Sequence, residues 1–163
     1  MPVSKLVGAR IKRREDPQLV RGAGQYVDDV RLPDMLHVAI LRSQYAHAGI
    51  KSIDTDAARQ HPGVIAVFTG SDIKDQIAPL PVGGGNDTLR VPKHYVLAVD
   101  KVCHVGQGIA AVVAEDRYIA EDALDLIRVE YEPLPAVADP EKALAPDSPV
   151  IHSEWPDNVA FRS

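Results

Sequence analysis

The sequence predicts an α+β fold that is rich in β-strand and contains two main helices. Two continuous apolar runs with β-branched residues, 64–68 and 109–114, are typical of buried strands. Helical patterns of moderate length are confined to residues 54–61 and 116–127. Two helices are too few for a doubly wound sheet of roughly five or six strands, because that sheet needs a crossover helix at each step.

The chain begins with a segment that is dense in positive charge. Residues 1–16 contain few apolar side chains, and their cations are Lys5, Arg10, Lys12, Arg13 and Arg14. We interpret this segment as an extended arm rather than as part of a core. A glycine-rich break at 22–24 then precedes a short strand candidate at 25–29.

Alternating apolar residues predict the first two regular strands, at 36–41 and 47–53. A short helix follows, for which Asp54 or Thr55 is the expected N-cap. The Pro62-Gly63 pair ends this helix.

The next strand, 64–68, is continuous and β-branched, which predicts burial on both faces. Residues 69–72 close it. Proline and glycine residues then exclude a helix from 73–95 and predict a long loop. A loop of this length in a compact domain either has a function or is covered by another part of the protein.

Regular structure returns with a strand at 101–102 and the second buried strand at 109–114. Asp116 is placed to cap a helix whose apolar residues recur at helical spacing. These residues are Ile119, Ala120, Ala123, Leu124 and Ile127. A last strand at 128–131 and a short helix near 140–144 complete the prediction.

Composition limits the function classes. Hydrophobic residues make up 45% of the 163 residues and charged residues 25%, as in ordinary globular domains. The net charge of −5 argues against a general nucleic-acid binder. A single cysteine excludes an intrachain disulfide, and no apolar run predicts a membrane span or a secretory signal. We therefore expect a cytoplasmic protein.

One glycine motif matches the dinucleotide fingerprint G-x-G-x-x-A. It extends from Gly106 through Gly108 to Ala111. The fingerprint binds pyrophosphate only where a helix begins, whereas strand-forming residues continue here to 114. A tight turn between two strands is the favoured interpretation, and a nucleotide-binding enzyme is the alternative.

Cys103 and His104, with His94 nearby, are candidates for a metal site. Zinc sites need three or four ligands at short paired spacings, and the chain has no second cysteine. A half-buried thiol and a surface histidine are favoured instead. The glycines at 83–85 are interpreted as a flexible loop, because no Gly-Lys-Ser/Thr sequence follows them.

Ser43 and His47 could be a nucleophile and its base, but no nucleophile elbow surrounds Ser43. We expect structural roles instead, with Arg42 pairing a carboxylate and His47 bonding the backbone. Asp28 and Asp29 are neighbours in a predicted strand, so their carboxylates should point to opposite faces and not share a proton. The residue chemistry therefore predicts no catalytic, cofactor-binding or metal site.

Three ordered blocks of residues resemble one known family. The first block comprises Gly22, Gly24, Tyr26, Asp28-Asp29, Leu32-Pro33, Leu41-Arg42-Ser43, Ala46-His47-Ala48 and Ile53-Asp54. The second block comprises Pro62-Gly63-Val64, Ala66-Val67, Thr69-Gly70 and Asp72. The third block comprises Lys101-Val102, Val105-Gly106-Gln107, Ala110, Val112-Val113-Ala114, Ala120, Asp122-Ala123, Val129, Tyr131-Glu132 and Leu134-Pro135. Together they resemble the N-terminal part of the large, molybdenum-binding subunit of the xanthine dehydrogenase and aldehyde oxidase family, in its carbon monoxide dehydrogenase-like branch.

The resemblance implies an α/β-hammerhead fold and a parent oxidoreductase. Such a parent oxidises or hydroxylates a small substrate, such as an aldehyde, an N-heterocycle or carbon monoxide, with oxygen from water. It carries molybdenum on molybdopterin cytosine dinucleotide, and iron–sulfur and flavin (FAD) centres sit on partner subunits. The family's catalytic residues belong to later segments, so Gln107 is not assigned as one.

The resemblance also predicts a domain organisation. Residues 1–16 are an arm, 17–145 the hammerhead domain, and 146–163 a linker toward the molybdenum-binding domains of the same subunit. The arm and the loop 73–95 are expected to contact those domains or the sister subunits. We expect the chain by itself to be an inactive scaffold, and a stand-alone binding module that reuses the hammerhead fold is the alternative.

Overall fold

The computed structural model describes residues 8–81 and 89–162. The chain divides into two compact units, Met1–Met35 and Leu36–Ser163. The first unit contains a short helix, α1 (Asp16–Val20), and a single 3₁₀ turn, η1 (Val27–Asp29). The strand predicted at 25–29 is therefore wrong. The Asp29 carboxylate accepts a hydrogen bond from the Tyr26 amide at 2.9 Å, and this local cap favours a turn over an extended chain.

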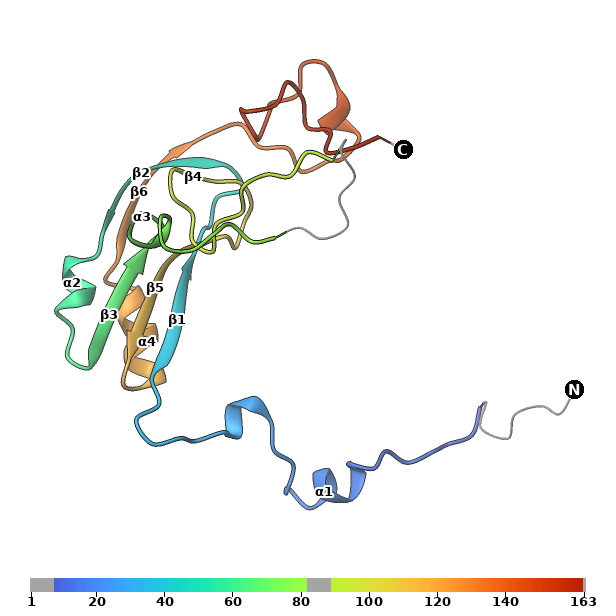
Figure 1. Cartoon of the computed structure of the whole chain (residues 1–163), viewed down its shortest axis with the longest axis vertical. Helices are drawn as coiled ribbons and strands as arrows, with labels where there is room; N and C mark the ends of the chain where they lie inside the picture. The colour runs from blue at the N-terminus through green and yellow to red at the C-terminus, as the bar shows by residue number, and fades with distance from the viewer. Residues whose placement is uncertain (1–7, 82–88, 163) are drawn as a thin grey trace, which may run out of the picture. The chain divides into compact units, whose positions relative to one another are not determined.

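The second unit is built on two three-stranded antiparallel sheets (Figure 1). The first sheet has the order β1 (His37–Arg42), β5 (Gly108–Ala114), β3 (Val64–Thr69). The second has the order β4 (Lys101–Val102), β2 (Ala48–Asp54), β6 (Arg128–Pro133). Each strand begins and ends within two residues of a predicted one, and β6 extends two residues beyond its predicted end, to Pro133.

Helices are short and lie beside the first sheet. The longest, α4 (Arg117–Leu124), contacts β1, β5 and β3. It begins as predicted, because the side chain of Asp116 accepts a hydrogen bond from the Tyr118 amide at 2.8 Å. Helices α2 (Asp56–Arg59) and α3 (Gly70–Ile73) contact β3, whereas the 3₁₀ turn η2 (Lys142–Leu144) lies in the C-terminal segment, away from this sheet (Figure 1). Thr55 is the N-cap residue of α2, at one of the two predicted positions.

Strand β5 forms the centre of the hydrophobic core. Ile109, Ala110, Val112 and Ala114 are fully buried, which confirms the buried strand predicted at 109–114. Alanines predominate where α4 packs on the sheet, because small side chains allow close approach of a helix. Ile53 and Val129, from the second sheet, pack against both core clusters and so connect the two sheets through apolar contacts.

Strand β3 is less buried than its sequence predicts. Val67 is buried, but Ile65 and Phe68 remain 54% and 42% exposed. The prediction of burial on both faces is wrong because β3 is an edge strand of a sheet that α4 covers on one side only. Helix α3 was also not predicted, since residues 69–72 were expected only to close the strand.

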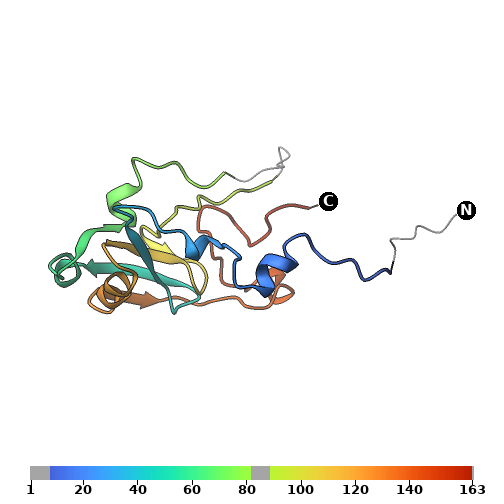
Figure 2. The ribbon, with the colours of Figure 1, turned by 90° about the horizontal axis from the view of Figure 1, so that it is seen from below.

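The described parts of 73–95 that follow α3 contain no helix and no strand, as predicted for a long loop. The chain before and after the undescribed residues 82–88 runs side by side (Figure 2). The amide of Leu80 joins the two parts by donating to the carbonyl of His94 at 2.7 Å. The glycines at 83–85 lie outside the described residues.

Candidate functional site

Most of the candidate residues meet where the chain leaves β1 and where it enters β5. The segment that follows β1 hydrogen-bonds through its backbone to the turn that precedes β5. The amide of Ser43 donates to the carbonyl of Gln107 at 2.9 Å, and the amide of Gly106 donates to the carbonyl of Ser43 at 2.8 Å. Residues that are about sixty positions apart in the sequence therefore form one junction, which we call the β1–β5 junction (residues 42–47 and 103–107).

Arg42 holds this junction by a contact different from the expected one. Its Nη1 donates to the carbonyl of Gly106 at 2.9 Å, whereas the sequence suggested a carboxylate partner. The turn makes this carbonyl available because Gly106 has a φ of +84°, which favours glycine. The guanidinium thus satisfies a backbone oxygen that the sheet ladder leaves unpaired.

The Ser43 hydroxyl stabilises the loop that follows β1. It donates to the carbonyl of Tyr45 at 2.9 Å and accepts from the amide of Tyr45 at 3.0 Å. Burial of the phenol raises the pKa of Tyr131, and the nearby Ser43 side chain opposes this shift. Because the hydroxyl proton is held by a carbonyl, this geometry is that of a turn-forming serine rather than of an activated nucleophile.

His47 bonds the backbone, as predicted. Its Nδ1 lies 2.7 Å from the carbonyl of Pro135, so Nδ1 must carry the proton that is shared in this hydrogen bond. The carbonyl of His47 in turn accepts from the amide of Leu134 at 3.0 Å. The side chain is only 6% exposed, and its Nε2 is buried with no hydrogen-bond partner among the described residues. His47 therefore fastens the end of β6 to the loop after β1.

The glycine motif at 106–111 is a turn. Strand β5 begins at Gly108, where a dinucleotide site would need the first turn of a helix. The nucleotide-binding interpretation is therefore wrong, and the tight turn between two strands is confirmed. Within the turn, Oε1 of Gln107 accepts a hydrogen bond from the amide of Cys103 at 2.7 Å, which is a structural role.

Cys103 and His94 line a hollow of about 350 Å³, together with Lys101, His152 and Glu154. Burial raises the pKa of the Cys103 thiol, so at neutral pH it is protonated and weakly nucleophilic. Burial also lowers the pKa of His152, whose ring centroid lies 6.4 Å from that of His94. His104 is exposed and is not among the residues that line this hollow.

These groups do not form a metal centre. No group of three or more His, Cys, Asp or Glu residues within 8–81 and 89–162 has the arrangement needed to hold a metal ion. Asp28 and Asp29, the other candidate pair, lie in η1, where Asp29 caps the turn. Their expected placement on opposite faces of a strand is therefore not observed.

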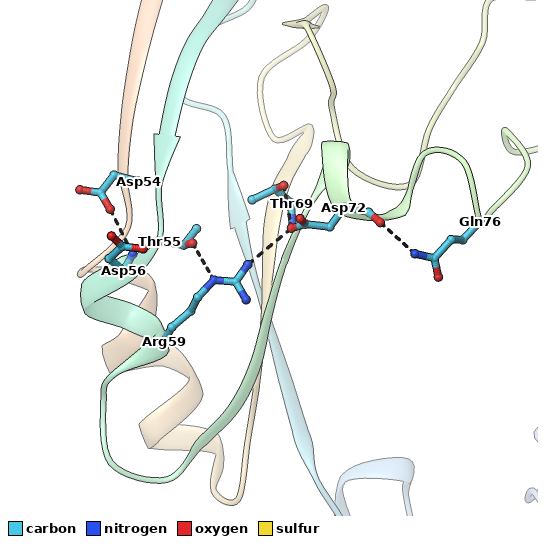
Figure 3. Close-up of polar contacts among 7 residues, drawn as sticks. All are labelled: Asp54, Thr55, Asp56, Arg59, Thr69, Asp72 and Gln76. Atoms are coloured by element: carbon cyan, nitrogen blue, oxygen red, sulfur yellow. Dashed lines mark hydrogen bonds and ion pairs between the residues drawn. The ribbon is translucent and has the colours of Figure 1, made fainter.

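A second polar network, which sequence reasoning missed, joins α2 to α3 (Figure 3). The carboxylate of Asp72 accepts hydrogen bonds from the amide and hydroxyl of Thr69 at 2.7 and 2.8 Å. Arg59 donates to Thr55 at 2.9 Å and lies 3.5 Å from Asp72. The hydrogen bonds from Thr69 hold the pKa of Asp72 below its ordinary value. The sequence pattern that could have predicted this network is the capping box Thr-x-x-Asp at 69–72.

The C-terminal residues are organised around Asn158. Its Oδ1 accepts from the amide of Ile151 at 3.0 Å, and its Nδ2 donates to the carbonyl of Pro149 at 2.9 Å. Arg90 forms an ion pair with the neighbouring Asp157, and its amide donates to the carbonyl of Ala160 at 2.9 Å. The end of the loop 73–95 is therefore attached to the C-terminal segment.

Across the described part of the chain, no helix is both long and apolar enough to cross a membrane.

The chain is similar to large subunits of several oxidoreductases. It is 46% identical over 154 residues to the carbon monoxide dehydrogenase large chain of Afipia carboxidovorans, covering 94% of this chain and 18% of that relative. Quinoline 2-oxidoreductase from Pseudomonas putida 86 has a similar structure, with a TM-score of 0.86 and 40% identity over 94% of this chain and 19% of the other. A Cu,Mo-CO dehydrogenase structure matches with a TM-score of 0.78 and 45% identity over the same shares, 94% and 19%.

The chain thus spans about a fifth of the length of these proteins. The family model described as the aldehyde oxidase and xanthine dehydrogenase a/b hammerhead domain matches residues 21–135. The two antiparallel sheets with few helices agree with the fold expected from the resemblance. On this evidence, the chain belongs to the aldehyde oxidase and xanthine dehydrogenase hammerhead-domain family.

Proposed function

We propose that this chain serves as the scaffold domain of a molybdenum-dependent oxidoreductase of the carbon monoxide dehydrogenase type. The observation that carries the proposal is the 46% identity to a carbon monoxide dehydrogenase large chain over 94% of this chain. In this role, the two sheets and their junction provide a rigid surface against which catalytic domains pack. The rigidity comes from the buried β5 and from the backbone contacts of the β1–β5 junction.

The parent reaction that we propose is oxidation or hydroxylation of a small substrate, with oxygen from water. Quinoline is an N-heterocycle and carbon monoxide a small gas, so the named activities of the similar structures support a small substrate but not one particular compound. Molybdenum, which is part of the name of the Cu,Mo-CO dehydrogenase, is the proposed metal, carried on molybdopterin cytosine dinucleotide. The proposed partners are the molybdenum-binding domains of the same subunit and iron–sulfur and flavin subunits, in the cytoplasm.

The described residues of this chain do not fit the molybdenum cofactor themselves. In the dinucleotide fingerprint the pyrophosphate meets backbone amides at the start of a helix, and the glycine motif at 106–111 leads into a strand instead. The buried imidazole of His47 uses Nδ1 to hold Pro135, which makes it a structural group. We therefore assign positioning and assembly, rather than chemistry, to this domain.

A chimera tests the proposal. The segment of the Afipia carboxidovorans large chain that matches this chain would be replaced by this sequence, and the protein would be expressed with its sister subunits. We expect the chimera to assemble, to retain molybdenum and to oxidise carbon monoxide. The native large chain is the matched control. A chimera in which the transplanted domain resists proteolysis but the subunit holds no molybdenum and does not assemble would contradict the proposal.

A further inference from the structure

Three aromatic rings attach residues 151–155 to the end of the loop 73–95. The ring centroid of His152 lies 6.4 Å from that of His94, with the two planes at 87°, and 5.3 Å from that of Trp155. Edge-to-face contacts of this kind are favourable between uncharged aromatic rings. His94, His152 and Trp155 form what we call the aromatic cluster, and its central ring is an imidazole that can bind a proton.

A fixed positive charge lies next to this imidazole. The Nζ atom of Lys101, on β4, donates to the carbonyl of Ile151 at 2.5 Å, so the ammonium group contacts the backbone of the residue before His152. Lys101 and His152 also line the same hollow of about 350 Å³. His152 is half-buried, and like charges repel more strongly where water is partly excluded. A proton on His152 would therefore be repelled by the ammonium group that holds the same segment.

Titratable groups from several elements surround His152. The basic groups are His47, Lys93, His94 and Lys101. The carboxylates are Asp100, Asp139 and Glu154, and Tyr95 and Cys103 also line the hollow. Burial is the main cause that lowers the pKa of His152 below its ordinary 6.5; Glu154 opposes this shift, and the basic groups add to it. The surroundings therefore favour the neutral ring while the segment is attached.

We propose that the aromatic cluster is a pH-sensitive attachment, in which protonation of His152 releases residues 151–155 from His94 and from the end of β4. Once released into water, the imidazole binds a proton with its ordinary pKa of 6.5, whereas the attached imidazole resists protonation. The released state thus binds more protons, so the attachment is fully stable above pH 6.5 and weakens as the pH falls. A single proton lowers the equilibrium constant for attachment by up to about tenfold for each pH unit, until the attached ring also becomes protonated.

The next attachment along the chain does not respond in the same pH range. Arg90 forms an ion pair with Asp157, and its amide donates to the carbonyl of Ala160 at 2.9 Å. A hydrogen bond from the Val159 amide is the main cause that holds the pKa of Asp157 below its ordinary 3.8, so this carboxylate stays ionised in mild acid. Protonation of His152 should therefore release residues 151–155 locally, while residues 157–160 stay attached to Arg90.

The single tryptophan of the chain provides a direct measurement, because its fluorescence reports on the aromatic cluster alone. On the whole chain, we expect the emission maximum of Trp155 to move to longer wavelength between about pH 8 and about pH 5, as the indole enters water. Hydrogen exchange, expressed as protection factors, should show a loss of about tenfold or more at 151–155 over this range. The amides of β5 should stay protected, which distinguishes local release from unfolding of the chain.

Substitutions of His152 separate its charge from its packing. His152→Phe keeps an aromatic ring that cannot bind a proton, so the fluorescence shift and the loss of protection should both disappear. His152→Gln is a second uncharged variant, and its protection at 151–155 should likewise not depend on pH. His152→Lys carries a permanent charge and should release the segment already near pH 8. His104→Gln is the matched control: it removes an exposed histidine that does not line the hollow, and it should respond to pH like the wild type.

Three results would overturn the proposal. The first is a wild-type chain whose Trp155 emission and protection at 151–155 are the same at both ends of the pH range. The second is a pH response that persists in His152→Phe and in His152→Gln. The third is protection that rises in acid, which would show that the Trp155 ring stabilises the charged imidazole by a cation–π contact. The inference concerns this segment alone, and it stands or falls independently of the proposed function.

Discussion

His47 connects two parts of the chain that lie far apart in the sequence. Its Nδ1 donates to the carbonyl of Pro135, and its own carbonyl accepts from Leu134, so the loop after β1 holds the chain that leaves β6. A buried hydrogen bond of this kind matters chiefly because its loss leaves a polar group without a partner. The imidazole therefore contributes to stability rather than to acid–base chemistry.

Replacing this imidazole tests its role. His47→Ala should lower the free energy of unfolding by about 1–3 kcal/mol, because it leaves the carbonyl of Pro135 unpaired and opens a small cavity. Urea denaturation measures the change. His104→Ala, at an exposed position, is the control and should change the unfolding free energy little. Equal effects of the two substitutions would contradict the role assigned to His47.

Asp72 gives a prediction about pH. Its folded-state pKa is lowered by hydrogen bonds from Thr69, so the ionised form stabilises the folded chain. This contribution is fully present above the ordinary pKa of 3.8 and is lost as the pH falls through the lower folded-state value. The difference in unfolding free energy between the wild type and Asp72→Asn should therefore be largest near neutral pH and decrease in acid.

Acid titration of stability measures this difference. Asp75→Asn neutralises a nearby exposed carboxylate and is the matched control. If the difference between the wild type and Asp72→Asn is the same at every pH, the capping role of the carboxylate is wrong.

Among the elements, α3 depends on a close approach at its first residue. A Cβ added to Gly70 would lie 2.1 Å from the carbonyl oxygen of Ala98, a backbone atom that cannot move without displacing its segment. Gly70→Ala should therefore destabilise the chain by about 1–3 kcal/mol or more, as overpacking generally does. Gly49→Ala in β2 is the control, because there the added Cβ meets Glu132 at an ordinary 3.7 Å. Thermal unfolding of the two variants compares them, and a Gly70→Ala variant as stable as Gly49→Ala would contradict this packing.

The elements also show what a sequence can predict about this fold. Helix α4 and strand β5 were predictable because their signals are local: a capping aspartate, a helical spacing of apolar residues and a continuous β-branched run. The exposure of Ile65 on β3 was not predictable, because it depends on the strand order β1–β5–β3, which is set by long-range pairing. The partner of Arg42 was missed for the same reason, since Gly106 is 64 residues away.

In the whole molecule, the shared core and the β1–β5 junction make the two sheets of Leu36–Ser163 one structural unit. The candidate residues of the sequence do meet in space, at the junction and in the hollow beside it. Their hydrogen bonds are made mainly to backbone groups, which fixes the geometry of the loops rather than activating a side chain. This is the arrangement that we expect of a scaffold on which catalytic domains assemble.

The boundaries 1–16, 17–145 and 146–163 stay predictions. Residues 151–160 hydrogen-bond around Asn158 and to Arg90, so the segment expected to be a linker makes specific contacts. A linker that holds the end of the loop 73–95 would present both segments to a neighbouring domain together. Limited proteolysis within a larger assembled subunit would show whether these two segments become protected at the same step.

The metal content of the purified chain tests the scaffold assignment most directly. The chain would be produced in a host that makes molybdenum cofactor, and mass spectrometry would give the ratio of molybdenum to protein. We predict a ratio far below one, because the described residues offer no cluster of metal ligands and their glycine motif at 106–111 leads into a strand rather than into a helix. The Cu,Mo-CO dehydrogenase to which the chain is similar, produced alongside, is the positive control. One molybdenum atom per chain would contradict the account.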